Sequence, residues 1–202
     1  MVQDLAMADR LALLLAAVRA CTRCAAHPPL GPRPVVQVHA SARILSAGQA
    51  PGRKVHDSGV PFDDASGERL RAWLGVSRGT FHDARQIAIL PMGLCYPGTG
   101  AAGDLPPRPQ CAPAWRAAWL ARLHTLVLRL VIGQYAQADH LPGAGASLTD
   151  TVQAWRRHWP DTVALPHPSP RNNLWLERHP WFEADLVPLL RTRVAAVLAH
   201  AA

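Results

Sequence analysis

The sequence predicts an α/β fold, a three-layer sandwich in which a central four-stranded parallel sheet is flanked by helices. The first observation behind this prediction is alternation, because four short apolar runs of strand length are separated by longer segments with helical patterns. The second is that each apolar run stops at a glycine or a proline. Strands that alternate with helices pair in parallel and are covered on both faces, so these patterns favour one domain over residues 1–202.

The first half of the chain supplies two of the four strands. A broad apolar face predicts a helix over 4–20, and the four prolines within 25–34 make that segment a connector. The run 44–47 is a strand that ends at glycine. The segment 66–74 predicts a helix whose first residue, a serine, is its N-cap. The run 87–90 predicts the second strand.

The second half repeats the alternation. The segment 113–124 predicts a helix with proline in its first turn, and 126–132 predicts the third strand. A helix over 149–158 and a strand over 162–165 follow. The segment 177–199 predicts a closing helix that Pro188 interrupts.

Polar and Gly/Pro-rich segments follow all four strands. In a parallel sheet the carboxyl ends of the strands share one edge, and ligands bind beyond it. The sequence therefore places the functional site on this rim, which is formed by Gly48–Gly52, Pro91–Cys95, Gly133–Tyr135 and Pro166–Pro170.

The four cysteines form two pairs. Cys21 and Cys24 make a C-x2-C pair, and Cys95 and Cys111 are separated by fifteen residues rich in proline and glycine. Four thiols with one tight pair suit a tetrahedral Zn²⁺ or a cubane iron–sulfur cluster. The alternatives are two disulfides or four unrelated buried thiols. We expect metal or cluster binding, because a C-x2-C pair in an intracellular chain is seldom accidental.

The N-terminal segment argues for a reducing compartment. Residues 1–10 carry two aspartates and lack the basic region of a signal peptide. The apolar run over 11–18 is too short to cross a bilayer. We therefore expect a cytoplasmic protein without a membrane partner, in which thiols stay reduced.

The charge is strongly positive. The net charge is +7, the pI is about 10.2, and 20 of the 21 basic residues are arginines. Arginine forks suit phosphates and base edges, so nucleic acid is the first candidate for an acidic partner. An arginine-rich surface inherited from a GC-rich genome would give the same composition, so charge alone does not decide the function.

Five sequence elements in order resemble the uracil-DNA glycosylase superfamily. Gly48-Gln49-Ala50-Pro51-Gly52, followed after seven residues by Val60-Pro61-Phe62, looks like the family's motif A. His167-Pro168-Ser169-Pro170 looks like its motif B. The two cysteine pairs, placed before and after motif A, look like the cluster ligands of the iron–sulfur (family 4-like) branch. The resemblance covers roughly 21–173.

This resemblance implies roles for individual residues. His167 would stabilise negative charge on the departing uracil as a neutral imidazole, helped by the backbone N–H groups of Gln49 and Ala50. Glycosylases flip the target nucleotide out of the duplex, and Phe62 would stack on the flipped base. Substrate contacts are implied at Gly48, Ala50, Phe62, Ser169, Arg171 and Asn172. Arg171 stands where the family inserts a wedge into the duplex.

Two positions depart from the related iron–sulfur enzymes. Gln49 replaces a glutamate, so it cannot act as a base. Pro91 replaces an asparagine that reads the uracil edge, so the base must be read differently here. The carboxylate that positions water is predicted to be Asp57, within the motif A loop, in preference to Asp63 and Asp64.

The sequence thus predicts a monofunctional enzyme that hydrolyses the N-glycosidic bond of uracil in DNA, leaves an abasic site and initiates base excision repair. A lyase reaction is not expected, because Lys54 is the single lysine and lies outside the motifs. The expected cofactor is a [4Fe-4S] cluster held by Cys21, Cys24, Cys95 and Cys111, with Zn²⁺ as the alternative, and the expected state is a monomer. The alternative functions are a catalytically altered DNA-binding member and an enzyme acting on small nucleosides.

Overall fold

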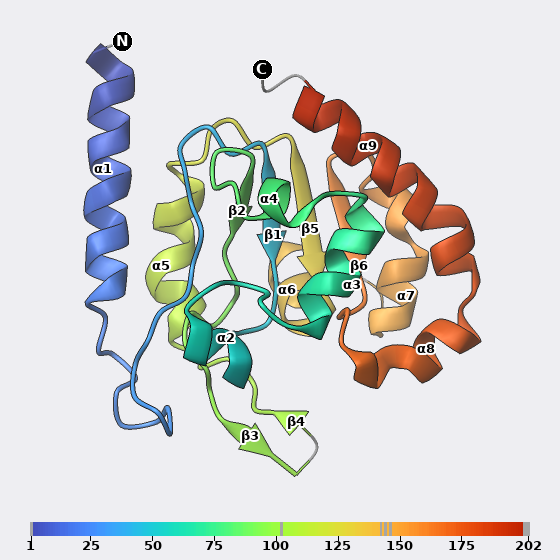
Figure 1. The fold of residues 1–202 in the computed structure, drawn as a ribbon, viewed down its shortest axis with the longest axis horizontal. Coiled ribbons are helices and arrows are strands. Elements are labelled where there is room, and N and C mark those ends of the chain that lie inside the picture. The colour runs from blue at the N-terminus through green and yellow to red at the C-terminus, as the bar shows by residue number, and fades with distance from the viewer. Residues whose placement is uncertain (1, 102, 142, 144, 146, 200–202) are drawn as a thin grey trace.

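The computed structural model describes residues 2–101, 103–141, 143, 145 and 147–199. It contains a four-stranded parallel sheet in the order β2-β1-β5-β6, which confirms the predicted α/β class (Figure 1). The strands are β1 (Ile44–Ala47), β2 (Ile87–Ile89), β5 (Leu128–Ile132) and β6 (Thr162–Leu165). Each strand lies within its predicted segment. Strands of a parallel sheet are buried on both faces, so they appear in the sequence as apolar runs of this length.

Helices cover both faces of the sheet. They are α1 (Val2–Arg19), α2 (Arg53–Ser58), α3 (Ala65–Leu74), α4 (Arg78–Phe81), α5 (Cys111–Leu120), α6 (Gly133–His140), α7 (Leu148–Gln153), α8 (Asn173–Arg178) and α9 (Val187–Ala199). Shorter turns are η1 (Trp155–Arg157), η2 (Pro170–Asn172) and the π-helical η3 (Phe182–Leu186). Among the described helices none is long and apolar enough to span a membrane.

Side chains of β1, β2 and β5 alternate between two apolar cores. Ile44 belongs to the core under α3, α4, α7 and α9, and the next residue, Leu45, belongs to the core under α1, α5 and α6. This alternation follows from the two-residue repeat of a strand. Figure 1 shows the consequence, with α1 and α5 on one side of the sheet and α3 and α9 on the other.

Three local predictions are wrong. Asp64, and not Ser66, caps α3, because its carboxylate accepts a hydrogen bond of 2.9 Å from the Gly67 N–H. The closing helix breaks at Pro180, which separates α8 from η3, whereas Pro188 sits in the first turn of α9 and is tolerated there. The helix predicted over 149–158 ends at Gln153, and the 3-10 turn η1 follows it.

A two-stranded antiparallel hairpin, β3 (Thr99–Gly100) and β4 (Gly103–Asp104), interrupts the segment between the third and fourth cysteines. It was not predicted, because two-residue strands carry no alternation. In Figure 1 it projects beyond the sheet edge, beside α2. It therefore stands at the rim where the functional site was expected.

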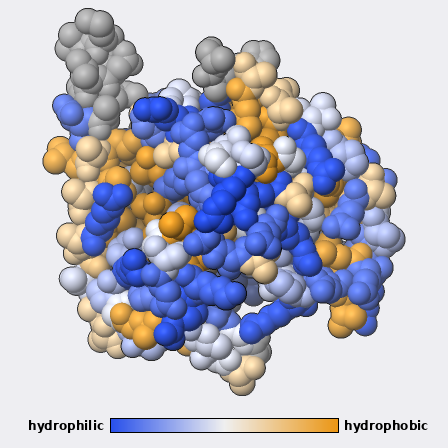
Figure 2. Space-filling model, viewed as in Figure 1, coloured by the Kyte–Doolittle hydropathy of each residue, from blue (hydrophilic) through white to orange (hydrophobic). Residues whose placement is uncertain are grey.

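The surface is unevenly polar. Figure 2 shows hydrophilic side chains over the centre of the face that carries α2, α3 and α4, and apolar ones at the left-hand edge near α1 and α5. On this polar face Arg53, Lys54 and Arg78 are exposed, and Arg53 and Arg78 pair with Asp57 and Asp63. A charged, polar surface thus borders the carboxyl edge of the sheet, where α2 begins.

Candidate active site

A cavity of about 610 Å³ opens at the carboxyl edge of the sheet. Segments that follow all four strands line it, which confirms the predicted rim. The lining from these segments is Gly48–Gly52, Pro91, Gln134, His167, Ser169, Arg171 and Asn172. Phe62, Asp64, Ser66 and Asp104 join them from the loop before α3, from α3 itself and from β4.

The motif A loop is tied to its neighbours. The carbonyls of Gly48 and Gln49 accept hydrogen bonds of 2.9 and 2.8 Å from the N–H groups of Met92 and Gly93. The side-chain amide of Gln49 donates to the Leu105 carbonyl at 3.3 Å. The loop after β1 is therefore fixed both to the loop after β2 and to the chain that leaves the hairpin.

Phe62 is held in a strained conformation at the cavity wall. Its φ is +54°, a region that non-glycine residues rarely adopt and that occurs mostly where the surrounding structure enforces it. Its ring passes close to Gly48 and packs edge-on against Phe81, with centroids 5.9 Å apart. The buried Arg71 guanidinium donates to the Phe62 carbonyl at 3.4 Å. These contacts hold an aromatic side chain in the lining of the cavity.

His167 has a defined tautomer. The Ser169 N–H donates to its Nδ1 at 3.2 Å, so Nδ1 is the acceptor and the neutral ring carries its proton on Nε2. Burial lowers the pKa of His167, and Asp64 and Asp104 oppose that shift. The Asn172 amide donates to the His167 carbonyl at 2.7 Å. The cavity therefore contains a neutral imidazole whose Nε2–H is a donor.

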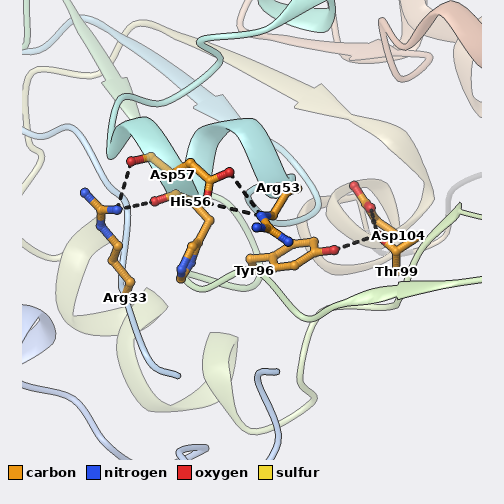
Figure 3. A network of polar contacts seen from close by, with 7 residues as sticks. All are labelled: Arg33, Arg53, His56, Asp57, Tyr96, Thr99 and Asp104. Carbon is orange, nitrogen blue, oxygen red and sulfur yellow. Dashed lines mark hydrogen bonds and ion pairs between the residues drawn. The ribbon is translucent and has the colours of Figure 1, made fainter. Parts of the chain in front are cut away.

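The carboxylates separate into two groups. Asp57 lies on exposed α2 and pairs with Arg53 at 3.0 Å (Figure 3), and it is not among the described residues that line the cavity. Asp63 pairs with Arg78 at 2.7 Å, and this hydrogen bond lowers the pKa of the Asp63 carboxyl. Asp64 and Asp104 do line the cavity. The structure thus brings two other carboxylates, and not Asp57, together with His167.

Asp104 was missed entirely at the sequence level. Its carboxylate accepts a hydrogen bond of 3.0 Å from the Thr99 hydroxyl, which is itself 2.6 Å from the Tyr96 hydroxyl (Figure 3). Its position between two cysteines of one loop was the available signal. Gln134 was noted only as part of a strand end, and it too lines the cavity.

The remaining motif B residues surround the cavity mouth. Ser169 caps η2, its hydroxyl accepting from the Arg171 N–H at 3.3 Å. The Arg171 guanidinium lies directly against the Gly103 backbone, where a Cβ would collide with it. Gly103 has a φ of +127°, a conformation that favours glycine. Arg171 therefore lies against β4 beside the turn of the hairpin.

The four cysteines line a second, small cavity of about 30 Å³, together with three prolines of the connector. All four are free thiols, so the two-disulfide alternative is not what the chain forms here. Burial raises the pKa of Cys95 to about 11 and also raises that of Cys111, and the neighbouring cysteines add to both shifts. Within the described residues, no three or more His, Cys, Asp or Glu side chains lie close enough together to hold a metal ion as they stand.

The sulfur donors nevertheless converge from three parts of the chain. The Leu94 N–H donates to the Cys111 sulfur at 3.3 Å, and a backbone N–H of Arg33 reaches Cys95. N–H donors to sulfur, an apolar shell and four thiolate-forming side chains are what a sulfur-ligated metal group requires. The residues present fit such a group.

A family model described as "Uracil DNA glycosylase superfamily" matches residues 36–191. The match includes all four strands of the sheet and every residue that lines the large cavity except Val35. It also includes Cys95 and Cys111, whereas Cys21 and Cys24 precede it.

Proposed function

Because the chain belongs to the uracil-DNA glycosylase superfamily, we propose that it hydrolyses the N-glycosidic bond of uracil in DNA and leaves an abasic site, initiating base excision repair. Membership makes the protein a DNA glycosylase that binds DNA. The choice of uracil and the monofunctional reaction are the proposal. The observation that carries it is the neutral His167 imidazole, with its proton on Nε2, in one cavity with the strained Phe62.

The reaction follows from these positions. A flipped uracil stacks on Phe62, and the bond between C1′ and N1 breaks with its electron pair moving into the base. The charge gathers on the carbonyl oxygen O2, where the Nε2–H of His167 and the N–H groups of Gln49 and Ala50 stabilise it. Water adds to C1′ and gives up a proton, and the uracil anion later takes one up.

The geometry favours Asp64 as the group that positions this water. Its Oδ1 accepts a hydrogen bond from the Gly67 N–H at the α3 N-terminus, and the residue lines the cavity. Asp57 is occupied by Arg53 on the surface of α2. The described cavity lining contains no lysine, in agreement with hydrolysis without a Schiff base.

The decisive assay uses synthetic oligonucleotides that contain one uracil, single-stranded and paired with guanine or adenine, followed by alkali treatment. Strand cleavage only after alkali supports a monofunctional glycosylase. Cleavage before alkali would mean lyase activity. A mobility shift without cleavage would support the alternative of a DNA-binding member with altered catalysis, which Gln49 in place of glutamate favours. Competition with other deaminated bases tests the range, because Pro91 lines the cavity without a polar side chain.

We propose that Cys21, Cys24, Cys95 and Cys111 hold a [4Fe-4S] cluster, with Zn²⁺ as the alternative. The group would be structural, since glycosidic hydrolysis needs no electron transfer. Its protein ligands would join the connector after α1 to the loop after β2, and so hold both ends of the segment that carries Asp104.

Replacement of Cys95 by alanine is expected to abolish stoichiometric metal binding, because three thiolates leave an open, oxidisable site. Iron and zinc per chain, together with the visible absorption of the purified protein, are the measurements. Thr22→Ala, within the same C-x2-C turn but without a ligand atom, is the control and should keep its metal. Full metal content in Cys95→Ala would contradict the four-cysteine assignment.

Arg171→Ala is expected to slow excision from duplex DNA several-fold and to spare single-stranded DNA. A wedge at the cavity mouth holds open a base stack that single strands lack. Excision on both substrates at two salt concentrations is the measurement, with Arg157→Ala, at the opposite edge of the sheet, as a charge-matched control. If both substrates weaken together and the salt slope of binding falls by about one, Arg171 is a phosphate contact instead.

A further inference from the structure

We propose that Arg69 is a positioning residue that holds the loop carrying His167 against helix α3. The inference rests on the proposed function, because it concerns how His167 is aimed at the departing base. Arg69 is not among the described residues that line the cavity, so it acts on the loop and not on the substrate.

Two hydrogen bonds carry the inference. One guanidinium nitrogen of Arg69 donates to the Ser169 carbonyl at 3.1 Å, and the other donates to the Asn173 side-chain oxygen at 2.8 Å. Ser169 caps η2 at one end and Asn173 follows it at the other. The rigid fork of an arginine therefore spans the whole turn after His167, which a single point charge cannot do.

The other hydrogen bonds of this loop are internal. Ser169 donates to the His167 ring, Asn172 donates to the His167 carbonyl, and Arg171 donates to the Ser169 hydroxyl. They fix the shape of the turn but not its place in the domain. Among the hydrogen bonds of the described residues, those of Arg69 alone tie 167–173 to another element.

Helix α3 is the element to which the rest of the site is also fastened. Asp64 caps its N-terminus, Gly67 in its first turn lies against the backbone of Phe62, and Arg71 in its last turn holds the Phe62 carbonyl. Contacts with α3 thus hold both the Asp64 carboxylate and the Phe62 ring in place. Arg69 ties the loop of His167 to the same helix, and so sets the distance between His167 and the base that stacks on Phe62.

Arg69→Met is expected to slow the single-turnover chemical step by about 10-fold. This is less than the roughly 10²-fold that a 1 Å misplacement of a catalytic group costs, because β6 and α8 still hold the two ends of the loop. DNA affinity should change little. Arg69→Lys, which reaches one acceptor but not both, should recover part of the rate. Arg191→Met is the matched control, because Arg191 also donates two hydrogen bonds to α3, at the Ala72 carbonyl, but on the side away from the cavity.

A second readout separates positioning from general destabilisation. The charged groups facing His167 are Asp64 on α3 and Asp104 on β4. If the loop loosens, the Ser169 N–H leaves Nδ1 and the ring gains solvent. Nitrogen-15 NMR of the imidazole should then show a mixed tautomer in Arg69→Met, and the acid limb of the rate profile should move to higher pH. Neither change is expected in Arg191→Met.

Equal rates and equal His167 spectra in Arg69→Met and Arg191→Met would overturn the proposal. So would a loss confined to DNA affinity with a reduced salt slope, which would make Arg69 a phosphate contact. The NMR comparison needs no turnover. If the wild-type protein excises no uracil, the proposed function fails, while the tautomer shift still decides whether Arg69 holds the loop.

Discussion

Replacing His167 with alanine is expected to slow the chemical step of uracil excision by about 10²–10³-fold, the scale of losing one donor to a developing oxyanion. DNA affinity should change little, because the half-buried ring lines the cavity and, being neutral, offers no charge to the phosphates. His167→Gln keeps an N–H donor of similar reach and should recover part of the rate. His124→Ala, an exposed histidine at the opposite edge of the sheet, is the control. Single-turnover rates within a few-fold of wild type would remove His167 from the mechanism.

The pH dependence has a definite sign. The active ring is neutral, and burial lowers its pKa below the ordinary value of about 6.5. Wild-type excision should therefore persist as the pH falls through 6.5 and decline only at more acidic pH, where the ring gains its proton. The same shift makes the unfolded state bind more protons, so this group's contribution to stability is present above its unfolded pKa and is lost as pH falls towards its folded pKa.

His140, outside the cavity, is expected to make the free energy of unfolding depend on pH in the same direction. Burial lowers its pKa to about 4, with Arg116 and Arg129 adding to the shift. The free energy of unfolding should thus decrease between about pH 6.5 and pH 4 even in His167→Ala. This separation lets the loss of activity in acid be assigned to the catalytic ring and the loss of stability chiefly to His140.

The strands and the rim were predictable because burial on both faces leaves a direct record in sequence. The run Ile44–Ala47 is buried at every position and apolar at all of them but Ser46, and the break at Gly48 marks the end of the strand. The rim then follows from parallel pairing alone. The segments that follow the strands are as visible as the strands, since a glycine or a proline marks the start of each.

The carboxylates were not predictable in the same way. Asp57, Asp63 and Asp64 lie close together in sequence, and which of them reaches the cavity depends on two surface arginines, Arg53 and Arg78, that pair with the first two. Those pairings are set by the turn of α2 and by the position of α4, which a local pattern does not reveal. Asp104 depends on a hairpin whose strands are too short for periodicity.

The position of Phe62 leads to the second large effect. Gly67→Ala is expected to lower the free energy of unfolding by about 1–3 kcal/mol, although alanine normally favours a helix over glycine. A Cβ at Gly67 would overlap the carbonyl oxygen of Phe62 and lie 2.8 Å from its Cβ. Both partners are constrained, since Gly67 lies in the first turn of α3 and Phe62 already holds a φ of +54°.

The same substitution should reduce excision by about 10- to 100-fold, because base–aromatic stacking is worth about 1–3 kcal/mol and the displaced ring no longer meets the base. Gly79→Ala is the matched control. Gly79 also lies in a helix, but a Cβ there meets nothing nearer than the Ser77 hydroxyl at 3.7 Å, so stability should be kept or raised. Chemical denaturation and single-turnover excision of both variants, with Phe62→Ala beside them, are the measurements.

If Gly67→Ala is as stable as Gly79→Ala, the contact is not tight. If it is destabilised yet excises uracil at the wild-type rate while Phe62→Ala does not, the ring keeps its place without this support. If Phe62→Ala is itself fully active, the ring serves the core and the stacking role is wrong.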